Sequence, residues 1–237
     1  MSAADTYIVS DVHLGNRHCH REQFLAFLDD LPAEARLVLN GDILDEPKDP
    51  LPDQDAVVLQ RLVAESERRS VVWVHGNHDD EIAIEESGEI QFVERWAVED
   101  RLLVMHGDEL DGVMPRHSFF KKAFKALHRF RIRLGFPDIH VADYAKRWGV
   151  LYRVLTRHVA DRALRTAQSQ GFDAIPCGHT HAPVDVTADG RRYMNTGCWT
   201  ESPSYVVIVR EEGGIDYRPF PGVVDAKSPS AGVPNST

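Results

Sequence analysis

The sequence predicts an α/β fold in which two β-sheets pack together between flanking helices. Three observations lead to this prediction: strands and helices alternate up to residue 75, short strands follow residue 89, and similar strands return after residue 181. Alternation favours a largely parallel sheet covered by helices, and the later strands call for a second sheet. With 237 residues, 43% of them hydrophobic, the chain can form one sizeable core.

The N-terminal part contains three apolar strands separated by two amphipathic helices. The segments 6–10, 36–40 and 70–75 are short apolar runs, which is typical of strands buried on both faces. The segments 21–31 and 53–66 repeat apolar residues at three- and four-residue steps, which is typical of helices that cover a sheet. We therefore expect successive β–α units with parallel strands.

The later strands are shorter and closely connected. The segments 90–93, 96–98 and 101–105 predict antiparallel hairpins, because only a few residues join each strand to the next. After residue 181 the same pattern predicts four more strands, with turns at Asp189-Gly190 and Gly213-Gly214: 184–187, 191–195, 204–210 and 215–220. These strands complete the expected second sheet.

Residues 115–170 predict a helical insertion between the two groups of strands, called the cap insertion below. Apolar residues recur in it at helical spacing, and basic residues fill many positions between them. We assign residues 1–220 to one domain that includes the cap insertion. Residues 221–237 are rich in Pro, Ser, Gly and Ala, and we expect them to form a disordered tail.

The charge of the chain is negative overall and positive in one place. A net charge of −10 argues against a general nucleic-acid binder, which needs basic side chains to neutralise phosphates. The stretch from Gly112 to Pro137 contains no acidic residue and seven basic ones: Arg116, Lys121, Lys122, Lys125, Arg129, Arg131 and Arg133. This part of the cap insertion therefore needs its own explanation.

The remaining composition indicates a cytoplasmic protein. There are three cysteines, an odd number that makes a disulfide framework unexpected. The first residues lack the basic and apolar regions of an export signal, and no apolar run approaches the roughly 18 residues that span a bilayer.

Residue types that bind metal ions stand where the apolar segments end. They are Asp11 and His13, Asp42, Asn77, His106, and His179 with His181. The carboxyl ends of parallel strands meet at one edge of a sheet, where α/β proteins commonly bind their ligands. A mixed set of oxygen and nitrogen donors suits Mn²⁺, Fe, Zn²⁺ or Mg²⁺, and a carboxylate such as Asp42 can bridge two ions. The sequence therefore predicts a metal centre and an enzyme.

These segments together resemble the motif set of the calcineurin-like metallophosphoesterases: Asp11-x-His13, Gly41-Asp42, Gly76-Asn77-His78-Asp79, His106-Gly107 and Gly178-His179-Thr180-His181. The resemblance extends from about Thr6 to Phe220. It implies a double β-sheet sandwich flanked by helices and two divalent metal ions. The ligands that it implies are Asp11, His13 and His181 for one ion and Asn77, His106 and His179 for the other, with Asp42 as the bridge.

The resemblance also implies a chemistry. Two ions about 3.5–4 Å apart can clamp a phosphoryl group and activate water for in-line attack. His78 would protonate the leaving oxygen or stabilise charge on the phosphoryl group, and Asp79 would hold its imidazole. Asp108 would be the hydrogen-bond partner of a ligand histidine. We expect Mn²⁺ as the metal, with Fe, Zn²⁺ and Mg²⁺ as alternatives.

A branch of this family gives the favoured substrate. Ser10–Gly15 and His106–Gly112, followed by a basic helical insertion, resemble the UDP-2,3-diacylglucosamine pyrophosphohydrolases of lipid A synthesis. That resemblance implies hydrolysis of the substrate's diphosphate to UMP and the lipid-sugar 1-phosphate. The best-known members of the branch place Arg after the Asn of the third motif, where this chain has His78.

The cap insertion agrees with a lipid-linked substrate. A helix with aromatic residues on one face and basic residues on the other can cap an apolar site or lie on an anionic membrane. We therefore expect a lipid-linked sugar nucleotide as the substrate and a peripheral contact with the inner face of the cytoplasmic membrane, without nucleic acid as a partner. Candidate diphosphate contacts are Arg17, Arg116, Lys121, Lys122 and Lys125.

Two other functions remain open at this stage. The protein could be a phosphodiesterase or phosphatase that acts on a soluble nucleotide or a phosphoprotein. It could also be a non-catalytic scaffold with the same fold, although a scaffold would be expected to lack ligands, and all seven are present. The aromatic stripe of the cap insertion could likewise be ordinary core packing.

Overall fold

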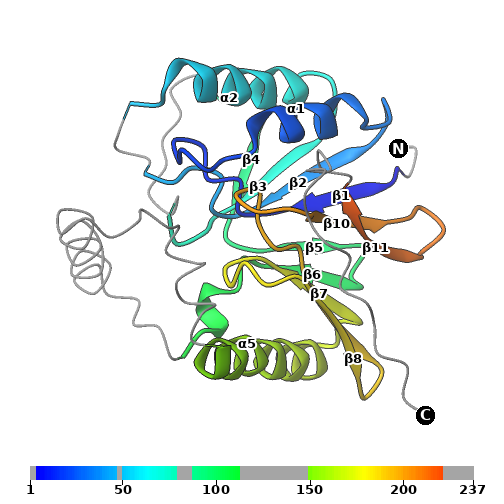
Figure 1. Cartoon of the computed structure of the whole chain (residues 1–237). Coiled ribbons are helices and arrows are strands. Elements are labelled where there is room, and N and C mark those ends of the chain that lie inside the picture. The colour runs from blue at the N-terminus through cyan, green and yellow to red at the C-terminus, as the bar shows by residue number, and fades with distance from the viewer. Residues whose placement is uncertain (1–3, 47–49, 79–86, 113–148, 221–237) are drawn as a thin grey trace, which may run out of the picture.

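The computed structural model describes residues 4–46, 50–78, 87–112 and 149–220, and two β-sheets form its centre (Figure 1). The first sheet has six strands in the order β11-β10-β1-β2-β3-β4. Its strands are β1 (Thr6–Val9), β2 (Arg36–Asn40), β3 (Val71–Val74), β4 (Gln91–Val93), β10 (Ser204–Val209) and β11 (Ile215–Phe220). From β1 to β4 neighbouring strands are parallel, as the β–α units predict, whereas β10 and β11 join antiparallel.

The second sheet has five strands in the order β5-β6-β7-β9-β8. These are β5 (Trp96–Val98), β6 (Leu102–Val104), β7 (Ala174–Cys177), β8 (Val184–Ala188) and β9 (Arg191–Asn195). The strand β6 runs parallel to β7, and β7 parallel to β9, while β5 and β8 pair antiparallel at the two edges. Both sheets are thus mixed, and the predicted α/β class with two sheets is confirmed.

One expected hairpin is wrong. The segment 90–93 was predicted to pair antiparallel with its neighbour 96–98, but β4 pairs parallel with β3 in the first sheet and β5 belongs to the second sheet. The two residues between β4 and β5 therefore carry the chain from one sheet to the other. The hairpins β5–β6, β8–β9 and β10–β11 are antiparallel as predicted.

The core between the sheets is formed by side chains that alternate along the central strands. Ile8, Val38 and Val72 lie on the face toward the second sheet and are fully buried against its residues Val104 and Met194. Alternate positions on the same strands pack toward the helices instead. Because helices cover the outer face and the second sheet covers the inner one, these strands are apolar at almost every position.

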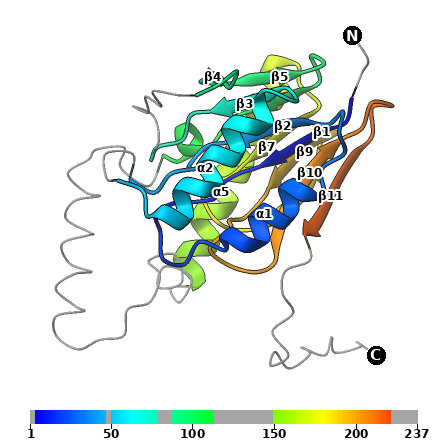
Figure 2. The same cartoon turned by 90° about the horizontal axis from the view of Figure 1, so that it is seen from above.

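Helices α1 (Arg21–Asp29) and α2 (Asp53–Ser66) cover the outer face of the first sheet (Figure 2). Phe24 and Phe27 of α1 pack with Trp199 in this layer. The two helices are also joined by a buried ion pair, in which Arg21 Nε donates to Asp55 Oδ1 at 2.9 Å. These contacts fix the helix layer over the strands that lead to the candidate site.

Helix α5 (Gly149–Gln170) covers the outer face of the second sheet. Its buried residues Val159, Ala160, Ala163 and Ala167 pack with those of β6, β7 and β9. The C-terminal part of the predicted cap insertion is therefore a flanking helix of the sandwich. The rest of the cap insertion, up to residue 148, and the predicted tail 221–237 lie outside the described residues.

Helix α5 is the longest helix in the described ranges, and neither it nor any other helix there combines the length and apolar character needed to cross a bilayer.

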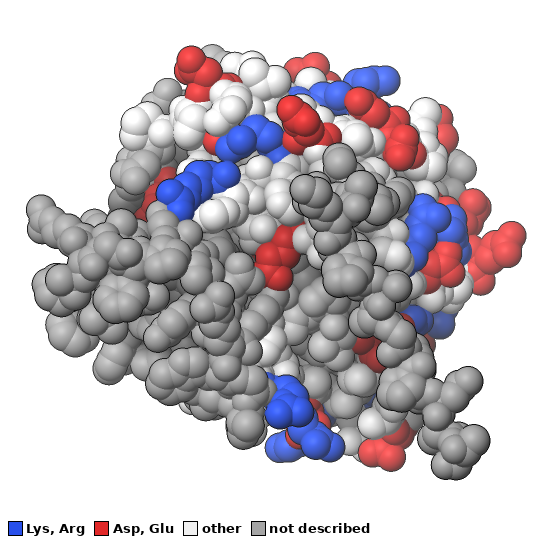
Figure 3. Space-filling view, viewed as in Figure 1, with Lys and Arg blue, Asp and Glu red and all other residues white. Residues whose placement is uncertain are grey.

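Acidic and basic side chains are interspersed over the described part of the face in Figure 3. Among the described residues, side chains of opposite charge form ion pairs, such as Arg192 with Asp185 and Arg210 with Asp216.

Candidate metal centre

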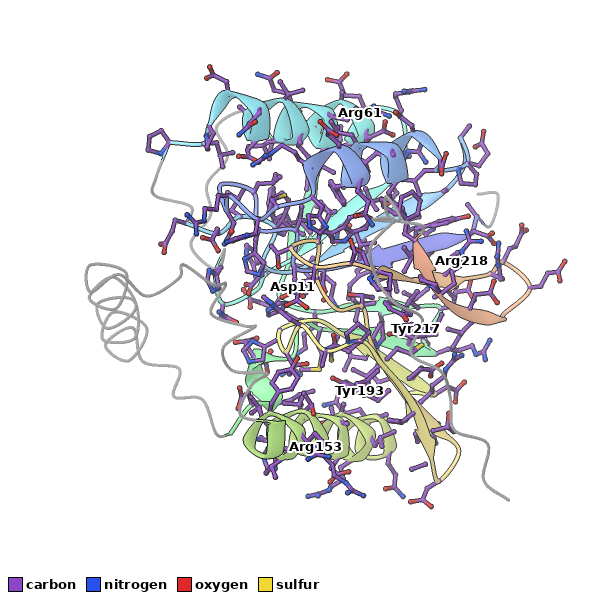
Figure 4. The ribbon with its side chains drawn as sticks, in the orientation of Figure 1. Asp11, Arg61, Arg153, Tyr193, Tyr217 and Arg218 are labelled. Carbon is purple, nitrogen blue, oxygen red and sulfur yellow. The ribbon has the colours of Figure 1, made fainter. Side chains whose placement is uncertain are left out.

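The predicted ligands lie together at the carboxyl ends of the parallel strands of both sheets. Loops after β1, β2 and β3 carry the ligands of the first sheet, and loops after β6 and β7 carry those of the second. Figure 4 shows Asp11 between the two layers, at the end of β1. The topology thus brings together residues up to 170 positions apart in the chain, from Asp11 to His181.

Asp11, His13 and His181 form the first group. The Nε2 atoms of the two imidazoles face each other at 3.0 Å, and Asp11 Oδ1 lies 3.1 Å from His181 Nε2 and 3.8 Å from His13 Nε2. Asp11 is fully buried, and the two histidines are almost fully buried or half-buried. One carboxylate oxygen and two imidazole nitrogens therefore converge on a single point.

His106, His179 and Asn77 form the second group. Nδ1 of His179 lies 2.8 Å from Asn77 Oδ1. Nδ1 of His106 donates to the backbone carbonyl of Asn40 at 2.9 Å, so that Nε2 is the ring nitrogen that faces the site. This Nε2 is buried and has no hydrogen-bond partner. A buried imidazole nitrogen whose other nitrogen is anchored on a carbonyl is the arrangement that metal-bound histidines show.

Asp42 lies between the two groups. Its Oδ2 is 3.3 Å from His106 Nε2, and its Oδ1 accepts a hydrogen bond from the backbone N–H of His78 at 2.8 Å. Carboxylate oxygens of Asp42 and Asp11 and a nitrogen of His106 all lie within 4.8 Å of one another. Asp42 is thus placed where a bridging carboxylate would be needed.

Charges in the site compensate one another. Burial raises the pKa of Asp42, but the imidazoles of His106 and His78 outweigh burial and hold that pKa well below its usual range. Burial lowers the pKa of His106, but Asp42 outweighs it and raises the pKa to about 10. The buried carboxylates therefore demand positive charge at the position of His106 Nε2, which a bound cation would supply.

Glycines allow the loops of the two sheets to approach each other closely. A Cβ at Gly41 would collide with the ring of His106, and Gly41 has φ +78°. A Cβ at Gly178 would collide with the carboxylate of Asp11 and with Ser10. The glycines of two predicted motifs are therefore explained by contacts across the site.

The ligand backbone is held in an unusual conformation. Asp11, His13, Asp42, His179 and His181 all have positive φ, between 53° and 66°. Non-glycine residues adopt this left-handed region rarely, at a cost of roughly 1–2 kcal/mol each. Such residues cluster at functional sites when the surroundings hold them there.

The environment of His78 differs in part from the expectation. Its Nδ1 donates to the backbone carbonyl of Asp45 at 2.7 Å, and the Asp45 carboxylate lies 3.9 Å from the same nitrogen. The Asp45 carboxylate also lies 3.1 Å from His13 Nδ1. Asp79, which was expected to hold His78, lies outside the described residues. Asp45 is therefore a site residue that the sequence did not identify.

A second such residue is Asp111. Its Oδ2 lies 3.0 Å from His179 Nε2, and its side chain is 1% exposed. It follows the short 3-10 helix η1 (Asp108–Leu110), whose first residue, Asp108, was the expected partner of a ligand histidine. Asp45 stands three residues after Asp42, and Asp111 five residues after His106. That proximity to ligands was the available signal for both.

Of the expected substrate contacts, only Arg17 lies within the described residues. Arg17 is exposed and donates from Nε to His18 Nε2 at 3.2 Å, in the loop that follows His13. The other four, Arg116, Lys121, Lys122 and Lys125, lie outside the described residues.

The residues present fit divalent metal ions. Facing imidazole nitrogens at 3.0 Å, a buried Nε2 of His106 without a hydrogen-bond partner and two buried carboxylates form a compact set of nitrogen and oxygen donors. Nitrogen and oxygen donors in this combination suit first-row divalent ions. A sandwich with such a centre at its strand ends defines a metal-dependent enzyme.

Residues 5–183 match the family of calcineurin-like phosphoesterases, and the chain belongs to this family. It is a metal-dependent hydrolase that acts on phosphoesters, and its grouped Asp and His side chains are placed to hold a metal ion. No curated protein sequence gives a significant match.

Several solved structures are similar in fold. Vacuolar Protein Sorting 29 from Cryptosporidium parvum is 12% identical, with 92% of this chain and 97% of that chain covered and a TM-score of 0.49. The phosphoesterase Yfce from E. coli is 17% identical, with 92% and 100% covered and a TM-score of 0.45. A novel archaeal phosphodiesterase is 15% identical, with 91% and 99% covered and a TM-score of 0.45. Similarity at these identities gives no information about the activity of this chain.

Proposed function

We propose that the protein is a dinuclear metallophosphohydrolase. In this proposal Asp11, His13 and His181 bind one ion, Asn77, His106 and His179 bind the other, and Asp42 bridges them. The observation that carries it is the convergence of His13 Nε2, His181 Nε2 and Asp11 Oδ1 within 3.0–3.8 Å, together with the buried Nε2 of His106 at 3.3 Å from Asp42 Oδ2. We propose Mn²⁺ as the native metal.

Two divalent ions would supply a Lewis-acidic clamp for the phosphoryl group and a water that ionises near neutral pH. The chain's own residues hold the geometry for this. Backbone N–H groups fix both buried carboxylates, since His179 donates to Asp11 at 3.1 and 3.2 Å and His78 donates to Asp42 at 2.8 Å. The carboxylates are thus oriented before an ion binds.

His78 is the proposed general acid. Its Nδ1–H is fixed on the carbonyl of Asp45 at 2.7 Å, and the Asp45 carboxylate lies 3.9 Å from the same nitrogen. When Nε2, on the opposite side of the ring, also carries a proton, it can donate that proton to the leaving oxygen of a substrate. Asp45 therefore contacts both His78 and the proposed ligand His13.

We propose UDP-2,3-diacylglucosamine, or a related lipid-linked nucleotide, as the substrate, cleaved to UMP and the lipid-sugar 1-phosphate. The support comes from the motif resemblance and from the basic, acid-free part of the cap insertion. Described residues on either side of residues 113–148 lie beside the centre: Asp111 contacts His179, and Tyr152 Oη donates to the carbonyl of Thr180 at 2.8 Å. We also propose a peripheral contact with the cytoplasmic face of the membrane through the basic residues.

A soluble nucleotide or phosphoprotein is the second candidate substrate class. His78, in place of the Arg of the best-known lipid A enzymes, favours it. The presence of all seven proposed ligands argues against a non-catalytic scaffold.

The test is hydrolysis by Mn²⁺-loaded protein of the acylated sugar nucleotide, its deacylated counterpart and a generic phosphodiester. We expect the acylated substrate to be cleaved fastest, and equal rates on all three would exclude the lipid substrate. Asp42→Ala and His181→Ala should abolish turnover, while Asp189→Ala, at an exposed turn, should leave it unchanged. Retained metal-dependent activity in Asp42→Ala would refute the proposed centre.

A further inference from the structure

The buried carboxylate of Asp111 meets the imidazole of His179 on the side away from Asn77. Asp111 Oδ2 lies 3.0 Å from His179 Nε2, and His179 Nδ1 lies 2.8 Å from Asn77 Oδ1. The two ring nitrogens of His179 therefore have different partners on opposite sides of the ring. Both partners offer oxygen atoms.

A carboxylate accepts hydrogen bonds and does not donate them, so the contact with Asp111 places a proton on Nε2 of His179. In the neutral imidazole, Nδ1 then carries a lone pair. That lone pair points at Asn77 Oδ1, which is itself an acceptor. Two acceptors 2.8 Å apart repel each other unless a cation lies beside both.

The loop that carries His179 is fixed from other directions. Asn195 Nδ2 donates to Thr180 Oγ1 at 3.1 Å, and Tyr152 Oη donates to the Thr180 carbonyl at 2.8 Å. The backbone of His179 is held on Asp11. These contacts set the position of the loop, and none of them determines which nitrogen of His179 holds the proton. Asp111 is the described residue that does.

We propose that Asp111 is a positioning residue that fixes the tautomer of His179 and so directs Nδ1, together with Asn77 Oδ1, at the second metal ion. This inference rests on the proposed dinuclear centre. If it is correct, the affinity of the second metal site depends on the carboxylate of Asp111. The first site does not share this contact, because its histidines are held by other groups, His13 by Asp45.

The experiment compares full-length wild type with Asp111→Asn and Asp111→Ala, with Glu109→Gln, in the short helix η1 just before Asp111, as the matched control. Each protein is freed of metal and titrated with Mn²⁺, and binding is followed by calorimetry and by electron paramagnetic resonance. Loss of a residue that hydrogen-bonds to a metal ligand typically weakens metal binding by about 10–100-fold. We expect a weakening of this size at one of two sites in Asp111→Ala, and a smaller one in Asp111→Asn, whose amide oxygen still accepts.

A second measurement separates this role from general support of the fold. With diamagnetic Zn²⁺ bound, ¹⁵N chemical shifts of the histidines report the protonated nitrogen. We expect His179 to be protonated at Nε2 in the wild type and to lose this preference in Asp111→Ala, while the other histidines keep theirs.

The outcomes are distinct. If wild type does not bind two ions, the proposed dinuclear centre fails and this inference falls with it. If wild type binds two ions and Asp111→Ala binds both with unchanged affinity, or weakens both equally, only the role of Asp111 is overturned. Glu109→Gln should behave as wild type, and an equal loss there would also overturn the inference.

Discussion

The two sheets contribute different chemistry to the candidate centre. The first sheet supplies both carboxylates, Asp11 and Asp42, from the ends of β1 and β2. The second sheet supplies only imidazoles, those of His106, His179 and His181, from the ends of β6 and β7. Positive ions would therefore be held between an acidic half and a neutral, nitrogen-rich half.

Each half is oriented by the other. Asp11 of the first sheet accepts hydrogen bonds from the backbone N–H of His179 in the second. In the opposite direction, His106 of the second sheet donates to the carbonyl of Asn40 in the first. Contacts between the two sheets therefore hold ligands of both halves in place.

The largest expected effect comes from forcing the two halves apart. In Gly178→Ala the new Cβ would collide with Asp11 and Ser10 across the site. Asp11 would then move away from His181. We therefore expect the Mn²⁺ affinity to fall by more than the roughly 10–100-fold that is typical when a residue that hydrogen-bonds to a ligand is lost. Calorimetric titration measures this. Gly214→Ala, where the nearest atoms are 3.7 Å away, should bind Mn²⁺ like wild type; an equal loss in both would show that the contact is not responsible.

The next effect is on stability. The amide of Asn40 donates from β2 to the carbonyls of Met105 and Pro176, at 3.1 and 3.2 Å, and so joins the first sheet to β6 and β7. Asn40→Ala removes both hydrogen bonds, and each contributes roughly 0.5–1.5 kcal/mol. We expect the free energy of unfolding, measured in urea without metal, to fall by about 2 kcal/mol. A decrease below about 1 kcal/mol would mean that the sheets do not depend on this contact.

A smaller, pH-dependent effect concerns the helix layer of the first sheet. The buried carboxylate of Glu65 lies 2.8 Å from Arg61 Nε and 2.6 Å from Arg69 Nε. Burial raises its pKa, but the two guanidinium groups outweigh burial and hold the pKa below 4.5. The ion pairs therefore stabilise the fold fully above pH 4.5, and the contribution is lost as pH falls through the lower pKa of the folded state.

We therefore expect Glu65→Gln to be less stable than wild type at pH 7 and the difference to shrink below pH 4.5. Urea denaturation at several pH values measures this. Glu67→Gln, on the neighbouring exposed position, should show no such dependence. A difference that grows toward low pH would contradict the assignment.

The smallest expected effect is at Tyr152. Tyr152→Phe removes one hydrogen bond, from the phenol of α5 to the carbonyl of Thr180. Such a bond contributes roughly 0.5–1.5 kcal/mol, so we expect the free energy of unfolding to fall by about 1 kcal/mol. The same measurement on Thr156→Ala, whose exposed hydroxyl bonds only within α5, should give a smaller change. Equal changes would show that α5 does not support the ligand loop.

The sequence predicted the central fold and the grouping of the ligands because both follow from local patterns. Apolar strands that alternate with helices become parallel, and the ends of parallel strands meet. The placement of β4 was wrong because two residues between short strands are compatible with a hairpin and equally with a crossing between sheets. The packing of α5 could not be predicted either, since its apolar stripe shows that one face is buried but not against which partner.

Asp45 and Asp111 were missed for a related reason. Their importance lies in contacts with His13 and His179, which are distant in the chain or on other loops. A single acidic residue near a motif gives no local pattern that separates it from a solvent-exposed one. Contacts between loops become visible only when the strand ends are placed together.

Four carboxylates surround the proposed metal positions: Asp11 and Asp42 as ligands, and Asp45 and Asp111 behind ligand histidines. Their four negative charges would balance the four positive charges of two divalent ions, so the loaded centre would be electrically neutral before substrate arrives. An anionic phosphate product would then add negative charge close to these four carboxylates. The acidic surroundings that hold the ions would thus also favour release of the product, and turnover would be less prone to inhibition by its own phosphate.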